Sequence, residues 1–165
     1  MEKRIIKPED PSILKFENKF SFPRKPGDEL PDLPEYLDDL GDEEFMRLYT
    51  EYTAWVSYAK AELVKAEIAE DREENAKRLI EARVLIEQWG SDAKSSDRVT
   101  IAKAKRDTDK RVIAQQDLYL QARAYRKLVD SVYDRCERAS QLLSRELTRR
   151  TSGAPRERRA ARYTT

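Results

Sequence analysis

The chain has 165 residues, of which 39% are charged and only four are glycine, and its net charge at neutral pH is +1. This composition suits one elongated helical protein better than two compact domains with large apolar cores. Since no apolar run approaches the roughly 20 residues that cross a membrane and no secretory signal is visible, we expect a soluble, cytoplasmic protein.

The first segment, residues 1–41, contains six of the seven prolines and therefore cannot form a long helix. Within it Leu14, Phe16, Phe20 and Phe22 alternate with charged residues, a spacing typical of an extended strand. We predict an extended, proline-rich arm. The arm could add a strand to the sheet edge of a partner, or its rings could stack on nucleic-acid bases. Alternatively, the rings could pack on the protein's own helices or on a neighbouring subunit.

The end of this arm is strongly acidic. From Asp28 to Glu51 the sequence holds ten acids and one base. Pro31 and Pro34 lie near the start of this stretch. Acids mixed with a few large apolar residues suit either a docking peptide for a basic partner or a solvated linker.

A first long helix is predicted from Asp42 to Gln88, because this stretch lacks proline and glycine and its apolar residues recur at steps of three and four. Asp42 is a suitable cap, and Gly90 follows the end of the helix. The predicted contact residues are Phe45, Tyr49, Tyr52, Val56, Ala59, Leu63 and Ala66.

Residues 89–107 are predicted to form a turn in which basic residues concentrate. Inside it, residues 99–102 are too few to classify alone and fit either a strand or a helical turn. From Lys94 to Arg111 there are seven bases against three acids, and Trp89 could add a stacking ring. Such a loop is either simply solvated or pairs with phosphates. The candidate phosphate contacts are Lys94, Arg98, Lys103, Lys105, Arg106, Lys110 and Arg111.

A second long helix is predicted from Thr108, as its cap, to Arg150, and the turn allows it to fold back antiparallel on the first. The single cysteine, Cys136, falls on its apolar face, where we expect it to pack. The predicted contact residues are Leu118, Ala122, Tyr125, Val129, Val132, Cys136, Ala139 and Leu143. Residues 42–150 would then form one coiled-coil-like helical hairpin.

The tail, residues 151–165, is rich in arginine and small residues and is predicted to be disordered. Arginine is always charged and suits phosphate, so the end of the chain is a second candidate nucleic-acid contact; it could instead bind an acidic protein surface, such as that of a neighbouring subunit. The residues concerned are Arg145, Arg149, Arg150, Arg156, Arg158, Arg159 and Arg162.

Motifs of catalysis are missing from the sequence. There is no histidine, no cysteine pair and no glycine-rich phosphate loop. We therefore expect no catalytic residues, no metal site and no cofactor, and a function that depends on surfaces.

The order of these elements resembles the UvsY-like recombination mediators of tailed bacteriophages. The residues that carry this resemblance lie within about 42 to 150 and comprise Tyr49, Tyr52, Trp55, Tyr58, Trp89, Gly90, Val99 to Val112, Tyr125 to Tyr133, and Ser144 to Arg149. The resemblance implies a ring-like homo-oligomer that binds single-stranded DNA and helps a RecA-like recombinase to displace the single-strand-binding protein. It also makes the basic turn a candidate DNA contact. The alternative from another class is a structural or scaffolding coiled-coil protein of phage particle assembly.

Overall fold

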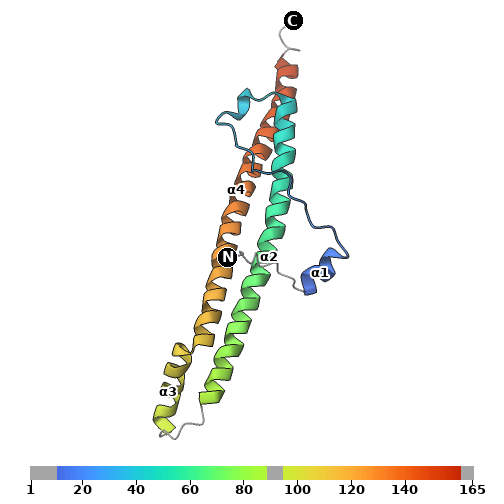
Figure 1. Ribbon diagram of the computed structural model, residues 1–165. Coiled ribbons are helices and arrows are strands. Elements are labelled where there is room, and N and C mark those ends of the chain that lie inside the picture. Colours follow the sequence, from blue (N-terminus) through green and yellow to red (C-terminus); the bar gives the residue numbers. More distant parts are fainter. Residues whose placement is uncertain (1–10, 89–94, 161–165) are drawn as a thin grey trace. The chain divides into compact units, whose positions relative to one another are not determined.

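The computed structural model describes residues 11–88 and 95–160. They form the helices α1 (Pro11–Glu17), η1 (Leu37–Asp39, a 3-10 helix), α2 (Asp42–Gln88), α3 (Ser95–Thr108) and α4 (Lys110–Ala160) (Figure 1). No strand occurs in the described residues, so the predicted all-helical class is confirmed. Among them, no helix combines the length and the apolar composition that crossing a membrane requires.

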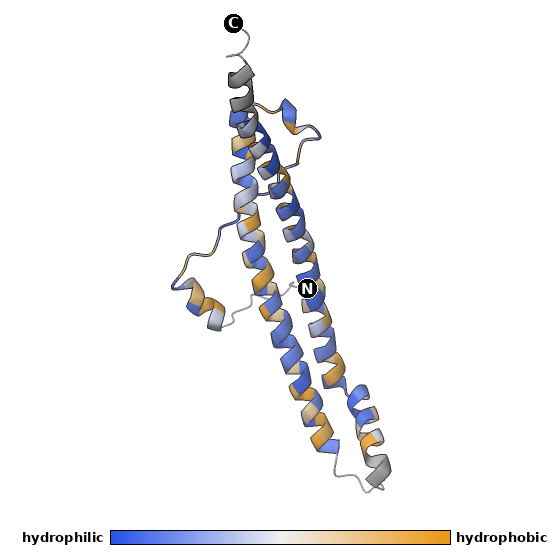
Figure 2. Ribbon diagram, turned by 180° about the vertical axis from the view of Figure 1, so that it is seen from behind, coloured by the Kyte–Doolittle hydropathy of each residue, from blue (hydrophilic) through white to orange (hydrophobic). Residues whose placement is uncertain are grey.

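The chain divides into two compact units, each of which contains part of α2 and part of α4. The first unit comprises Met1–Lys15 and Leu63–Val129, and the second comprises Phe16–Glu62 and Asp130–Thr165. Polar residues predominate on both long helices, with apolar residues recurring at intervals (Figure 2). The burial of those apolar residues explains the packing within each unit.

In the second unit, α2 and α4 pack antiparallel through the predicted spacing of three and four. Phe45 and Tyr52 of α2 are buried with Ala139 and Leu143 of α4 in one cluster. Trp55, Ala59 and Cys136 form the next cluster. Small residues on α4 thus face large rings on α2, which lets the two helices approach closely. The predicted packing role of Cys136 is confirmed, since its side chain has no exposed surface.

The acidic end of the arm also packs in the second unit, although most of it has no regular structure. The hydroxyl of Tyr52 donates a hydrogen bond of 2.6 Å to the carbonyl oxygen of Pro31. Four leucines of this segment contact the first cluster: Leu30, Leu33, Leu37 and Leu40. The segment is therefore neither a free docking peptide nor a solvated linker, because these four leucines pack on the protein's own core.

In the first unit, α2 and α4 again pack antiparallel, but polar contacts share the interface with apolar ones. Gln115 donates a 2.6 Å hydrogen bond to the Glu73 carboxylate, and Arg126 pairs with Glu70. The buried apolar side chains of this unit include Leu63, Ala66, Val84, Ala102 and Val112. Partnered polar groups can occupy such positions because each retains its hydrogen bonds.

The predicted contact face of the second long helix was wrong at three positions. Leu118, Tyr125 and Val132 are 41%, 56% and 46% exposed. The residue after each of them is more buried, namely Tyr119, Arg126 and Tyr133. Each of these three has a polar partner on α2, since Lys77 lies over the Tyr119 ring, Glu70 pairs with Arg126, and Lys60 lies over the Tyr133 ring. A spacing of three and four residues fits the predicted positions and the positions that follow them equally well. The side chains with partners on α2, which are the second set, face that helix.

The ends of the long helices also differ in detail from the prediction. The first bond of α2 runs from the Phe45 amide to the Gly41 carbonyl oxygen, so Gly41 occupies the cap position predicted for Asp42. At the start of α4, the Asp109 carboxylate accepts a 2.8 Å bond from the Arg111 amide. Asp109 is therefore the cap, whereas the Thr108 hydroxyl donates back to a carbonyl oxygen of α3.

Three segments predicted to be irregular or extended contain helix. Residues 11–17 form α1 instead of a strand, and residues 95–108 form α3 inside the predicted turn. α4 continues ten residues beyond Arg150, where a disordered tail was predicted. A helix that is already nucleated needs only to add residues, and the Thr151 and Ser152 hydroxyls bond to carbonyl oxygens of the preceding turn. Residues 161–165 lie outside the described residues.

The adjacent leucines Leu142 and Leu143 test the packing of the second unit. Leu143 is fully buried, whereas Leu142 is 46% exposed. We expect Leu143→Ala to lower the free energy of unfolding by about 2–5 kcal/mol, because it leaves a cavity. Leu142→Ala should cost less than about 1 kcal/mol. Urea unfolding followed by circular dichroism measures both, and equal losses would contradict the packing described here.

Candidate nucleic-acid interface

Three lysines at α3 and the start of α4 present positive charge to solvent. Lys103 and Lys105 on α3 and Lys110 on α4 are exposed. None of the three makes an ion pair with a residue that the structure describes. Lys103 and Lys105 are two residues apart on α3 and therefore point to different sides of that helix, and Lys110 is the first residue of α4, which Asp109 caps. Unpaired lysines on a short helix are available to phosphate.

Arg106 and Arg111, in the same region, have partners. Arg106 pairs with Asp107 at 2.6 Å, and Arg111 pairs with Glu87 at 2.6 Å and with Asp109 at 3.0 Å. Hydrogen bonds from Arg111 lower the pKa of the Glu87 and Asp109 carboxyls, and these two carboxylates raise the pKa of Arg111. Ion pairs of this exposed kind are weak and are screened by salt. A phosphate can therefore compete for these guanidinium groups, but less easily than for the unpaired lysines.

Two other predicted residues of this region cannot be placed. Lys94 lies outside the described residues. Arg98 belongs to α3, but its side chain is outside the described part.

At the end of α4, in the second unit, Arg150 is enclosed by acceptors from the arm and from α2. Its guanidinium donates to the Asp42 carboxylate at 2.8 Å and to the carbonyl oxygens of Leu37 and Leu40 at 2.7 and 3.0 Å. It also lies 4.4 Å from the centre of the Phe45 ring. Its donors are therefore used in holding η1 and the start of α2.

Glu146 links Arg150 to its neighbour Arg149. The Glu146 carboxylate is 9% exposed and accepts bonds of 2.7 to 2.8 Å from both guanidinium groups. Arg149 also pairs with Asp38. Hydrogen bonds from Arg149 and Arg150 lower the pKa of Glu146 to about 2, and the acids around them raise the pKa of both arginines. We call Asp38, Asp42, Glu146, Arg149 and Arg150 the charge cluster. The acidic surface that these arginines contact belongs to their own chain.

The remaining predicted arginines differ in how far the structure describes them. Arg145 is exposed on α4. Arg156, Arg158 and Arg159 lie on the last turns of α4, but their side chains are outside the described part, and Arg162 is outside it altogether.

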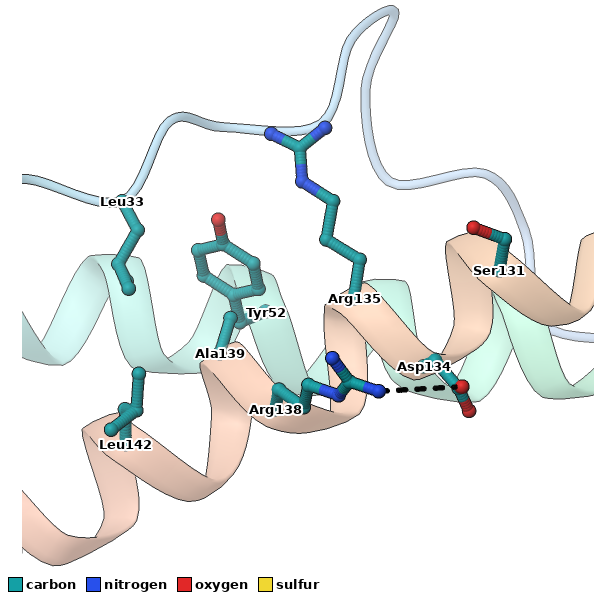
Figure 3. Close-up of a pocket in the computed structure, with 8 residues that line it drawn as sticks. All are labelled: Leu33, Tyr52, Ser131, Asp134, Arg135, Arg138, Ala139 and Leu142. Atoms are coloured by element: carbon teal, nitrogen blue, oxygen red, sulfur yellow. Dashed lines mark ion pairs between the residues drawn. The ribbon is translucent and has the colours of Figure 1, made fainter.

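A groove in the second unit was not predicted from the sequence. It has a volume of about 380 Å³ and is lined by Leu33, Tyr52, Ser131, Asp134, Arg135, Arg138, Ala139 and Leu142 (Figure 3). The two arginines stand on neighbouring turns of α4, and their ion pairs with described residues are long, 3.9 Å from Arg135 to Asp32 and 3.8 Å from Arg138 to Asp134. They escaped prediction because nearby acids cancel their charge along the sequence. The described residues hold no group of acids and cysteine that could bind a metal ion.

No protein-family model, no curated protein and no solved structure matches this chain.

The charge cluster predicts a specific pH dependence of stability. Because the pKa of folded Glu146 is about 2, below its ordinary value of 4.5, its stabilising effect is present above pH 4.5 and is lost as the pH falls toward 2. We expect Glu146→Gln to be less stable than the wild type at pH 7, with the difference narrowing over that interval. Urea unfolding between pH 7 and pH 2 measures the difference.

Glu67→Gln is the control for this experiment, because Glu67 is exposed on α2 and makes no ion pair with a described residue. It should match the wild type throughout. A deficit in Glu146→Gln that stays constant down to pH 2 would argue against the ionised cluster.

Proposed function

We propose that this chain is a non-enzymatic protein that binds single-stranded DNA and acts as a recombination mediator for a RecA-like recombinase in the cytoplasm of a phage host. The observation that carries the DNA-binding proposal is the set of exposed lysines Lys103, Lys105 and Lys110, which have no acidic partner in the described residues. The mediator role and the displacement of the single-strand-binding protein rest on the resemblance to the UvsY-like family.

The preference for a single strand rests on the resemblance to the UvsY-like family, whose members bind single-stranded DNA. Flexible lysines pair with phosphates without fixing a base sequence, so we expect little sequence specificity. A few phosphate contacts per subunit give useful affinity only when several subunits bind together, and the proposal therefore includes a homo-oligomer.

The exposed apolar face of α4 supplies a surface for that oligomer. In the first unit, Leu118, Tyr125 and Leu128 are 41%, 56% and 68% exposed, and steps of seven and three bring them onto one side of the helix. A helix face of this kind is typical of contacts between helices of different subunits.

The same face favours a second candidate function, that of a scaffolding protein in phage particle assembly. In that case, α4 and the basic residues contact only protein. The two functions differ in the role of the exposed lysines, which DNA binding requires and scaffolding does not.

Replacing the three lysines tests the DNA-binding function. We expect Lys103→Gln, Lys105→Gln and Lys110→Gln together to weaken binding to a single-stranded oligonucleotide by about tenfold to hundredfold, and to reduce the slope of log affinity against log salt by about 2. Fluorescence anisotropy across a salt series measures both quantities.

The matched control removes three exposed bases elsewhere, with Arg47→Gln, Arg72→Gln and Lys127→Gln. It changes the net charge equally but should keep most of the affinity. Equal losses in the two variants would show only a general charge effect and would count against an interface at α3.

The apolar face of α4 can be tested separately by light scattering. Tyr125→Glu together with Leu128→Glu should lower the mass of the particle, because charges would be buried between subunits. The control pair, Leu79→Glu and Ile86→Glu, changes residues on α2 that are 61% and 74% exposed. An unchanged mass in the α4 variant, or a wild type that is monomeric, would overturn this assignment.

A further inference from the structure

Three phenylalanines near the end of α1 form an aromatic cluster. The amides of Lys19 and Phe20 both donate to the Phe16 carbonyl oxygen, at 2.9 and 2.8 Å, so the chain turns directly after α1. This turn brings the centres of the Phe16 and Phe20 rings to 4.9 Å from each other, with an angle of 34° between the ring planes. The Phe22 ring meets Phe16 edge-on at 5.0 Å. The cluster is therefore held by backbone hydrogen bonds and by ring contacts.

Two of the three phenylalanines are exposed, whereas Phe22 is partly buried. Phe20 is 58% exposed and Phe16 is 46% exposed. An exposed phenylalanine loses the free energy that burial of its ring would give, and adjacent exposed rings often mark a binding surface. In contrast, the leucines in the acidic end of the same arm pack on the core. The arm thus divides into a part that stabilises the fold and a part that is left open.

Basic residues flank the phenylalanines along the sequence. Residues 15–25 contain four bases and one acid. Lys19 and Arg24 are exposed and make no ion pair with a described residue. Lys25 is already used, since its ammonium group donates to the Asp28 carbonyl oxygen at 2.6 Å and lies 5.9 Å from the Trp55 ring centre. An apolar surface with cations at its edge suits a ligand that has both flat rings and negative charge.

We propose that Phe16 and Phe20 form a stacking platform for the bases of single-stranded nucleic acid, with Lys19 and Arg24 contacting the adjacent phosphates. This inference deepens the proposed function and rests on it. Unstacked bases offer the flat faces that exposed rings bind, and the backbone supplies the negative charge. A duplex keeps its bases stacked inside, so this platform would also discriminate against double-stranded DNA.

The test compares an oligothymidylate with an abasic phosphodiester strand of the same length. The wild type should bind the oligothymidylate about tenfold more tightly than the abasic strand. Phe16→Leu with Phe20→Leu keeps apolar side chains but removes the rings. It should bind oligothymidylate about tenfold more weakly than the wild type does, bind the abasic strand equally well, and show an unchanged salt slope.

Tyr36→Leu is the matched control, because Tyr36 is a 64% exposed ring in an acidic part of the arm. It should bind both strands as the wild type does. Thermal unfolding of both variants should match the wild type, since the rings they remove are exposed.

The outcomes separate this inference from the proposed function. If the wild type binds oligothymidylate and the double phenylalanine variant binds it equally well, the stacking platform is wrong and DNA binding stands. Equal weakening on both strands would also overturn stacking, and would indicate that the rings contact protein. If the wild type binds neither strand, the proposed function fails, and the inference fails with it.

Discussion

The packing of α2 against α4 is the interaction on which the other features of each unit depend. Polar residues predominate on both helices, so the side chains that each buries against the other form a narrow line. In the second unit, this line pairs rings with small residues, as Tyr52 with Ala139. In the first unit, it admits hydrogen-bonded polar pairs such as Glu73 and Gln115. The remaining faces of both helices are left for contacts with other molecules.

Charge pairing then determines which basic residues remain available. Arg149 and Arg150 follow the sequence pattern of a phosphate-binding end, but the acidic end of the arm occupies them, and Phe45 covers one face of Arg150. Multiply bonded guanidinium groups are costly to release, above all that of Arg150, whose side chain is only 17% exposed, so these two arginines stabilise the second unit. The lysines of α3 have no such partners in the described residues. The lysines of α3 therefore remain candidate DNA contacts, whereas Arg149 and Arg150 do not. Local sequence composition alone does not distinguish these two groups.

Much of the fold could be predicted from the sequence because the apolar spacing in α2 is regular. Its bounds, Asp42–Gln88, and its buried residues Phe45, Tyr52 and Leu63 match the prediction, although Gly41 and not Asp42 is the cap. On α4, two faces fit the same spacing. Tyr119 and not Leu118 faces α2 because Lys77 of α2 lies over the Tyr119 ring, and the sequence of α4 alone does not show this contact. The short helices α1 and α3 were missed because seven or fourteen residues give too few turns for a clear period.

The candidate site was predictable only in part, for a similar reason. A local excess of lysine identified the region of α3, whereas the ion pairs of Arg149 with Asp38 and of Arg150 with Asp42 join residues more than 100 positions apart. Such pairing depends on the antiparallel packing within the second unit. The arginines of the groove, Arg135 and Arg138, were missed for a different reason, because acids next to them in the sequence offset their charge.

The most direct test of this account is the binding of the unmodified protein to single-stranded and duplex oligonucleotides of equal length, measured by anisotropy across a salt series, with light scattering on the same sample. We predict an oligomer that prefers the single strand and whose affinity falls steeply with salt. An oligomer that is indifferent to DNA at moderate salt would contradict the account and would leave the scaffolding function as the better explanation of these surfaces.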